Sequence, residues 1–153
     1  MGIIGLAAPA VLGHGGVQIQ LALPTQNSNG QMAGRYVLAR CGAQTATERA
    51  ENWQFYLRRP LFFAGAPRPW LEDANVQVWR LLARTTGDDP ALRWLGNLAP
   101  QQTLNVIGPT GNGFPLPETT RRLLLIADET RAPLLLPLVE AVLDRGGRVS
   151  LLL

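Results

Sequence analysis

The sequence predicts a small antiparallel six-stranded β barrel followed by a truncated β-α-β unit. Up to residue 107, apolar residues alternate with polar ones in several short segments, as expected of strands that bury one face. After residue 122, a wholly apolar strand, a helical stripe and a second strand follow one another, which is typical of a parallel β-α-β unit. We therefore expect residues 1–116 to form the barrel and residues 117–153 to form an incomplete Rossmann-like unit.

Six short segments predict the barrel strands, because their apolar residues alternate or cluster between turn signals: residues 1–12, 17–23, 35–41, 53–63, 76–83 and 104–107. The first of them is read as an early strand or an arm packed on the core. Pro60 interrupts the fourth and indicates a sheet edge or a bulge. Residues 64–73 predict a loop, and residues 91–98 predict a short helix in which leucines recur at a spacing of three.

The β-α-β unit begins with residues 123–126, which are apolar on both faces and predict a parallel strand covered from both sides. Residues 133–144 carry a helical apolar stripe, Gly146 and Gly147 indicate its end, and residues 148–153 predict a second strand. One such unit cannot bury both faces of its sheet. We therefore expect another chain to complete it, most simply by two-fold pairing of identical chains.

The composition argues against several classes of site. The chain of 153 residues is 46% hydrophobic and 16% charged, which allows a real core. Its basic residues are dispersed arginines, so nucleic acid is not an expected partner. The single cysteine, Cys41, excludes an internal disulfide and a self-contained iron–sulfur cluster, and it fits a cytoplasmic protein. With one histidine, His14, no metal site and no catalytic residue is predicted. The apolar start is too short to span a membrane.

The segment 107–114, IGPTGNGF, contains three glycines and a proline. It lies where the sequence changes from the alternating pattern of the barrel strands to the pattern of the β-α-β unit. Such a segment fixes a tight backbone path that leaves little side chain in the way of a ligand or a neighbouring domain. A plain turn between two domains accounts for the same residues.

Together with LRRPL at 57–61 and the β-α-β pattern after residue 122, GPTGNGF resembles the ferredoxin-reductase superfamily. Within it, the chain is most similar to the electron-transfer subunit of dihydroorotate dehydrogenase. The resemblance covers residues 34–153 and implies a barrel of the FAD-binding type. By that resemblance, the residues expected to hold the flavin are Arg58, Arg59, Pro60, Leu61, Phe62, Gly108, Pro109, Gly111, Asn112, Gly113 and Phe114.

Three departures from the family pattern bear on the cofactors. Arg59 matches the arginine that lies near the FAD pyrophosphate in relatives, but Phe62 stands where they place a Ser or Thr that hydrogen-bonds the flavin ring. A second reading puts residues 61–63 in the barrel core and the arginines at a solvated edge. The phosphate-binding G-x-G-T turn is replaced by a segment with Asp88 and Asp89 before the helix, where acidic side chains repel an anion.

The third departure is the loop 127–133, ADETRAP, which has no glycine where relatives place a dinucleotide. Asp128 and Glu129 there bring the protein's own negative charge to the helix start. The sequence therefore argues against NAD(P)H binding in the usual manner.

Two functions are compatible with these residues. The first is a flavoprotein module of the ferredoxin-reductase type that binds FAD and passes electrons to a partner redox subunit. The alternative is a degenerate, non-catalytic assembly or regulatory module that has lost FAD and NAD(P)H binding and dimerises through its half-domain. A third idea is another flat ligand in the vacated cleft near Trp53, Phe62 and Trp94. Whether the chain is an enzyme is left open.

Overall fold

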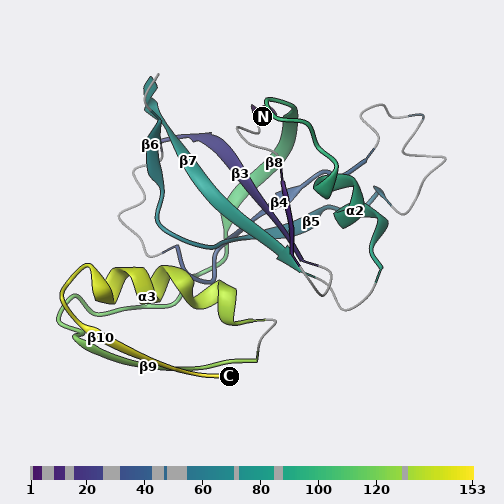
Figure 1. Ribbon diagram of the computed structural model, residues 1–153. Coiled ribbons are helices and arrows are strands. Elements are labelled where there is room, and N and C mark those ends of the chain that lie inside the picture. The colour runs from purple at the N-terminus through teal and green to yellow at the C-terminus, as the bar shows by residue number, and fades with distance from the viewer. Residues whose placement is uncertain are drawn as a thin grey trace.

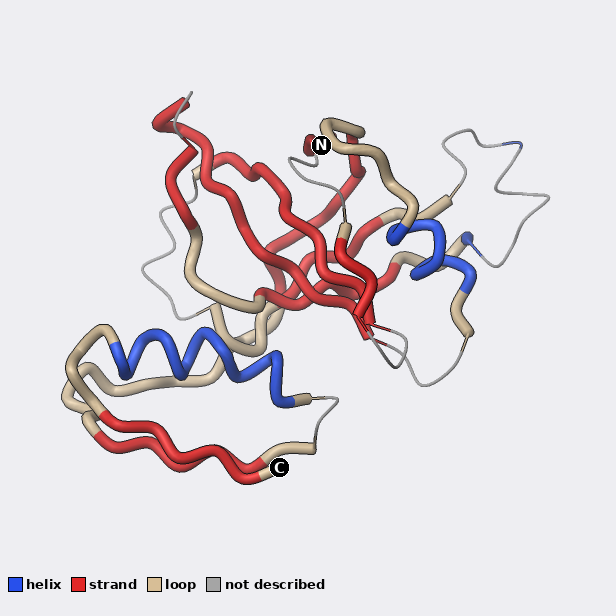
Figure 2. Tube along the Cα trace, in the orientation of Figure 1, coloured by secondary structure: helices blue, strands red, loops and turns tan. Residues whose placement is uncertain are grey.

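A computed structural model describes residues 2–4, 9–12, 16–25, 32–42, 47, 55–70, 73–84, 88–128 and 131–153. Within these ranges the chain forms two sheets (Figures 1 and 2). The larger sheet contains eight strands: β1 (Gly2–Ile4), β2 (Ala10–Leu12), β3 (Gly16–Pro24), β4 (Tyr36–Ala39), β5 (Arg59–Phe63), β6 (Arg68–Trp70), β7 (Asp73–Arg84) and β8 (Thr103–Thr110). The smaller sheet contains β9 (Arg122–Ile126) and β10 (Arg148–Leu152).

The larger sheet is antiparallel and curls back on itself. Its hydrogen-bonded order is β1-β8-β4-β5-β7-β3-β2, with β6 paired to β7. β1, at one end of this order, also contacts β3, near the other end. The predicted antiparallel barrel is therefore confirmed, and the predicted arm at 1–12 supplies two of its strands.

The barrel encloses the main hydrophobic core. Phe63 and Trp79 meet edge-on inside it, with ring centroids 4.8 Å apart. Segment 35–41 behaves as its alternation predicts, since Val37, Ala39 and Cys41 are all buried. The helix α2 (Pro90–Gly96) contributes Ala91, Leu92 and Leu95 to the same core. The predicted short helix is confirmed, and it packs its apolar face on the barrel.

Two predicted barrel segments need correction. The long β segment at 53–63 is shorter than expected: the strand β5 covers only Arg59–Phe63, residues 55–57 form a turn, and 53–54 lie outside the described residues. Its partner β4 ends at Ala39, opposite Arg59, so the ladder stops there. The predicted loop at 64–73 contains the strand β6, which tolerates Pro69 because it is an edge strand paired to β7.

In the smaller sheet, β9 and β10 run parallel, as predicted, and the connection between them contains η2 (Ala132–Leu135) and α3 (Leu136–Leu143). Within the chain β9 is covered on one face only, as expected of a single β-α-β unit, and cover of its other face by a second chain stays a prediction. Leu125 is 7% exposed beneath the helix, whereas Leu124 is 59% and Ile126 73% exposed. A single helix can cover one face of a two-stranded sheet, and the other face stays open.

The two sheets meet along α3 (Figure 1). Ala33, from the turn before β4, packs with Leu125 and Leu138 in a second apolar cluster. The Phe114 amide donates to the Ala33 carbonyl at 2.9 Å, which ties the segment after β8 to the same turn. The boundary at 116/117 stays a prediction, although the change from one sheet to the other falls between β8 and β9.

Candidate functional site

The two segments predicted to hold a flavin lie on either side of one strand. β4 pairs with β5 through Tyr36–Phe62 and Ala39–Arg59, and with β8 through Tyr36–Thr110 and Ala39–Val106. Residues 58–62 and 108–114 are therefore brought together by β4, although they are distant in sequence. We call the surface formed by these three strands the β5–β4–β8 surface.

Arg58 is bound to the barrel backbone rather than standing at a solvated edge. Its Nη1 donates to the carbonyls of Leu38 at 3.1 Å and Asn105 at 3.3 Å. Its Nη2 donates to Asn105 Oδ1 at 2.7 Å. Burial and the nearby charge of Arg40 lower the pKa of Arg58 from its ordinary value. The guanidinium thus fastens the end of β4 to β8.

Arg59 makes a two-pronged ion pair with Asp89. Its Nε donates to Oδ2 at 2.7 Å and its Nη2 donates to Oδ1 at 3.3 Å. The two side chains are 22% and 13% exposed. Asp89 is also the N-cap of α2, since its Oδ1 accepts from the Ala91 amide at 2.9 Å. A charge-assisted fork of this kind is among the strong hydrogen-bond arrangements in proteins.

The pKa values of the pair follow from this geometry. The side-chain hydrogen bond to Asp89 raises the pKa of Arg59 above its ordinary value, although burial opposes it. Burial pulls the pKa of Asp89 upward, but hydrogen bonds from Arg59 and from backbone amides of α2 outweigh it and leave that pKa lowered. Both groups are therefore held in their charged forms at neutral pH.

The remaining residues of the segment alternate between the core and the outer face. Leu61 is 1% exposed inside the barrel, so it is closed to direct contact with a ligand. Pro60 is exposed, and Phe62 is half-buried on the outer face. The Phe62 ring packs against Tyr36 in a tilted arrangement, with centroids 5.4 Å apart and an angle of 53° between the ring planes. The reading that placed residues 61–63 in the core holds for Leu61 and Phe63 but not for Phe62.

The glycine-rich segment turns beside the same tyrosine. Gly108 has φ 137° and Gly111 has φ 91°, conformations that side chains rarely adopt. A Cβ on Gly111 would lie 3.3 Å from Tyr36 Cε1, so the backbone passes close to the ring. Of the other predicted residues, Pro109 and Gly113 are half-buried, Asn112 is exposed, and Phe114 is 46% exposed.

A second glycine shapes this corner from the other side. A Cβ on Gly34 would lie 2.8 Å from Phe114 Cε2, so the aromatic ring rests directly on the Gly34 backbone. Tyr36, Phe62 and Phe114 thus offer partly exposed aromatic surface around the turn at 111–113. We call this part of the surface the aromatic end, and the part around Arg59 the arginine end.

The two ends differ in how well they fit a flavin dinucleotide. Partly exposed aromatic rings beside a glycine turn suit a flat heteroaromatic ring, which gains from stacking. The arginine end does not fit a pyrophosphate, because the Arg59 fork is already held by a carboxylate of the same chain. A phosphate would have to displace that carboxylate and approach its negative charge.

In the loop after β9, an acidic side chain is also paired with groups of the same loop. Asp128 Oδ1 accepts from the Arg131 amide at 2.9 Å, and Oδ2 pairs with Arg131 Nη1 at 2.8 Å. Glu129 lies outside the described residues. That this loop does not take NAD(P)H stays a prediction, and its one described acidic side chain is engaged with Arg131.

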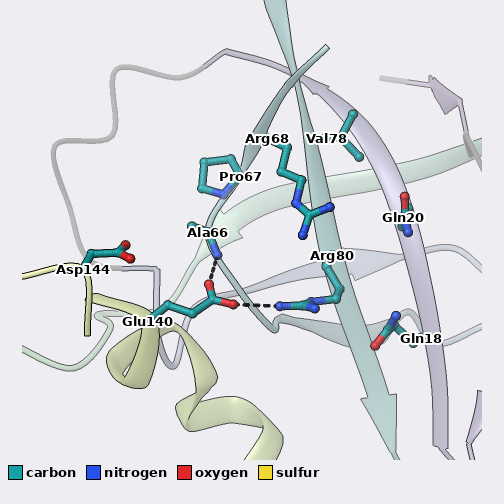
Figure 3. Close-up of a pocket in the computed structure, with 9 residues that line it drawn as sticks. All are labelled: Gln18, Gln20, Ala66, Pro67, Arg68, Val78, Arg80, Glu140 and Asp144. Atoms are coloured by element: carbon teal, nitrogen blue, oxygen red, sulfur yellow. Dashed lines mark hydrogen bonds and ion pairs between the residues drawn. The ribbon is translucent and has the colours of Figure 1, made fainter. Parts of the chain in front are cut away.

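A groove of about 410 Å³ lies between the barrel and α3 (Figure 3). Glu140 reaches across it from the helix: Oε2 accepts from the Ala66 amide at 2.6 Å, and Oε1 accepts from Arg80 Nη2 at 2.9 Å. Gln18, Gln20 and Arg68 line the barrel side, and Asp144 lies on the helix side. Because Glu140 binds two barrel groups at once, its contacts across the groove hold α3, and with it the smaller sheet, against the barrel.

Three contacts at these sites were not identified from the sequence. Asp89 was recognised as an acidic residue before the helix, but its partner Arg59 was not. Tyr36 lies in the predicted strand at 35–41, and the pattern gave no sign of its contact with Phe62. Glu140 lies within the predicted helix and gave no signal of its contact with Ala66. Of the flat-ligand residues, Trp94 packs against the barrel core from α2 and Trp53 lies outside the described residues.

Cys41 is fully buried, and burial raises the pKa of its thiol to about 12. Within the described ranges, no group of three or more His, Cys, Asp or Glu side chains is arranged to hold a metal ion. None of the helices in that part of the chain is long and apolar enough to cross a membrane.

Comparison with known proteins supports the resemblance drawn from the motifs. No protein-family profile matches the chain. Over 96 residues, 61% of this chain, it is 34% identical to the electron transfer subunit of dihydroorotate dehydrogenase B (NAD(+)) of Geobacillus sp. (strain WCH70). That match covers 34% of the relative, so the chain spans about a third of its length.

Solved structures confirm the fold. The NADH-dependent reduced ferredoxin-NADP oxidoreductase superposes with a TM-score of 0.67 at 16% identity, covering 99% of this chain and 48% of that one. Phthalate dioxygenase reductase superposes with a TM-score of 0.63 at 14% identity, covering 97% and 42%. The predicted architecture, a barrel of the ferredoxin-reductase type followed by a truncated β-α-β unit, is thus confirmed. The match to the electron transfer subunit supports the predicted resemblance to that superfamily.

Proposed function

We propose that this chain, which has the ferredoxin-reductase fold and resembles an electron-transfer subunit, is a flavin-binding module that passes electrons to a partner redox subunit. The main support is the pairing of β4 with both β5 and β8, which brings the two segments that the resemblance assigns to the flavin side by side. Tyr36 and Phe114, with the glycine turn between them, supply the aromatic end on which the flavin ring would rest. FAD is the flavin that the resemblance implies.

The smaller sheet favours a partner. Leu124 and Ile126 of β9 are exposed, and so is Leu152 of β10, the register partner of Ile126 on the same face. Contiguous exposed apolar side chains are typical of an interaction surface. We propose that a redox subunit or a second copy of this chain covers this face, and that the assembly works in the cytoplasm.

The absorbance of the purified protein tests the flavin proposal. We expect bands in the visible blue after the protein is incubated with a flavin and passed through a desalting column. Serum albumin treated in the same way controls for carry-over. A protein that retains no flavin after incubation with riboflavin, FMN or FAD would show that the flavin proposal is wrong.

The Arg59–Asp89 pair favours the second candidate, a degenerate module that has lost cofactor binding and serves assembly. In that case the absorbance test gives no flavin bands, while the exposed apolar face still finds a partner. Light scattering coupled to size-exclusion chromatography checks the second point, because this candidate requires a dimer. A monomer that retains flavin excludes it.

A further inference from the structure

We propose that Asp89 is the specificity-determining residue of this module. Its carboxylate accepts the hydrogen bonds of the Arg59 guanidinium and thereby prevents the phosphate groups of a cofactor from binding to Arg59. Only the identity of the cofactor rests on the proposed flavin function. The claim that Asp89 blocks Arg59 rests on the geometry of the ion pair alone. The consequence for a flavin is that its ring supplies the affinity, while its phosphates add little.

The first argument is that Asp89 uses the donors that a phosphate would need. Arginine binds carboxylate and phosphate through the same planar fork of N–H groups. Here the fork from Nε and Nη2 ends on the two carboxylate oxygens of Asp89. The remaining guanidinium nitrogen, Nη1, donates to the Leu57 carbonyl at 2.9 Å. The arginine is therefore committed to groups of its own chain on both sides.

The second argument is that Asp89 is held in place independently of Arg59. As the N-cap of α2 it accepts from the Ala91 amide, and α2 is anchored by Leu92 and Leu95 in the barrel core. An anion fixed in the same molecule competes at a high effective concentration. A phosphate from solution must overcome this advantage and the remaining charge of Asp89.

The third argument is that the neighbouring charges do not offset Asp89. Arg58 donates to Leu38 and Asn105 and so fastens β4 to β8. Asp88, the residue before Asp89, adds a second carboxylate, which is 70% exposed and pairs with Arg93 at 3.2 Å. The arginine end therefore presents the chain's own acid to an approaching phosphate.

Calorimetric titration with inorganic pyrophosphate tests the role of Asp89 without any flavin. Asp89→Asn removes the charge but keeps a good N-cap, because Asn caps helices about as well as Asp. We expect this variant to bind pyrophosphate about 10-fold more tightly than the native chain, since one strong competing ion pair is removed. The matched control Asp88→Asn changes a neighbouring carboxylate that does not contact Arg59, and a smaller gain is expected.

A double variant, Asp89→Asn with Arg59→Gln, should lose the gain, and thermal unfolding of each variant confirms that it is folded. The proposal is overturned if the native chain binds pyrophosphate with an affinity that Arg59→Gln abolishes. It is equally overturned if Asp89→Asn gains no more than Asp88→Asn.

A series of flavins extends the test to the proposed cofactor. Riboflavin has no phosphate, FMN has one and FAD has two. The native chain should bind all three within about 3-fold of one another, whereas Asp89→Asn should favour FMN and FAD over riboflavin. A native chain that strongly prefers FAD through Arg59 contradicts the role of Asp89. A chain that binds no flavin in any variant contradicts the proposed function, while the pyrophosphate titration still decides the role of Asp89.

Discussion

The arginine end and the aromatic end of the β5–β4–β8 surface belong to the same three strands and differ in what fills them. Along β4 they lie three residues apart, roughly 10 Å. At the arginine end, Asp89 from α2 satisfies Arg59. At the aromatic end, glycines keep side chains out of the way, and the rings of Tyr36 and Phe114 stay partly exposed. The strand pairing can thus preserve the layout of a binding surface while single side chains decide which part of a ligand it accepts.

The largest expected effect comes from adding a side chain at Gly108, where β8 passes close to β4. In Gly108→Ala the new Cβ would lie 3.1 Å from both the Tyr36 carbonyl oxygen and Val37 Cα, at a φ of 137°. We expect a loss of roughly 3 kcal/mol in the free energy of unfolding, measured by urea denaturation.

Gly146→Ala is the matched control, because Gly146 also has a positive φ, 70°, but a Cβ there meets nothing within 4 Å. It should cost about 1 kcal/mol, the backbone contribution alone. Equal losses in the two variants would show that the close approach of Gly108 to β4 does not matter.

The next largest effect is expected from removing the Asp89 side chain at the arginine end. Asp89→Ala removes both the N-cap of α2 and the partner of Arg59, so we expect a loss of about 2 kcal/mol in the free energy of unfolding. Asp89→Asn keeps the cap and should lose about half as much. Asp88→Ala, at an exposed pair, should change stability by less than about 0.5 kcal/mol. If Asp89→Ala were no worse than Asp88→Ala, the ion pair would be only a surface contact.

Replacing Phe62 alters the edge of the aromatic end. Phe62→Ser removes the ring that packs at a tilt against Tyr36, which should cost about 1 kcal/mol of stability. It also opens space and supplies a hydroxyl donor, so we expect riboflavin to bind several-fold more tightly by fluorescence quenching. Phe62→Ala, which opens space without a donor, separates the two contributions. A weaker affinity in both variants would mean that the Phe62 ring itself supports the ligand.

The smallest effect is a pH dependence confined to acid. The lowered pKa of Asp89 means that its charged form stabilises the fold above the ordinary value of 3.8, and this stabilisation is lost as the pH falls through the folded value. The difference in unfolding free energy between the native chain and Asp89→Asn should be constant near pH 7 and vanish in strong acid. Urea midpoints measured from pH 7 to pH 2 check this, and a difference independent of pH would contradict it.

Local patterns predicted most of the elements but not the contacts between them. Segment 17–23 and the helix at 91–98 were found because their periods are set by neighbours in sequence. The strand β6 was missed because Pro67 and Pro69 look like a loop, and only its pairing with β7 makes it a strand. The apolar sequence of β9 alone indicates cover on both faces, and only the presence of a single helix in the unit predicts that one face, with Leu124, is exposed within the chain.

At the candidate site, too, local motifs could be predicted from the sequence and contacts between distant residues could not. The motifs GPTGNGF and RRP indicated which residues to compare, because each is a contiguous string. The ion pair between Arg59 and Asp89 joins residues 30 apart in sequence, and it depends on where α2 docks on the barrel. No spacing rule reports such a contact, so the sequence places the acidic pair before the helix but does not reveal that Arg59 is the partner of Asp89. That these acids oppose phosphate stays a prediction.

The most direct test of the account is the NMR signal of the Arg59 Nε–H group, assigned by its loss in Arg59→Gln. In the native chain this group donates to Asp89, so its signal should be protected from exchange and unmoved by millimolar pyrophosphate. In Asp89→Asn the same signal should shift as pyrophosphate is added. A native signal that shifts with pyrophosphate as readily as that of the variant would contradict the claim that Asp89 keeps phosphate from Arg59.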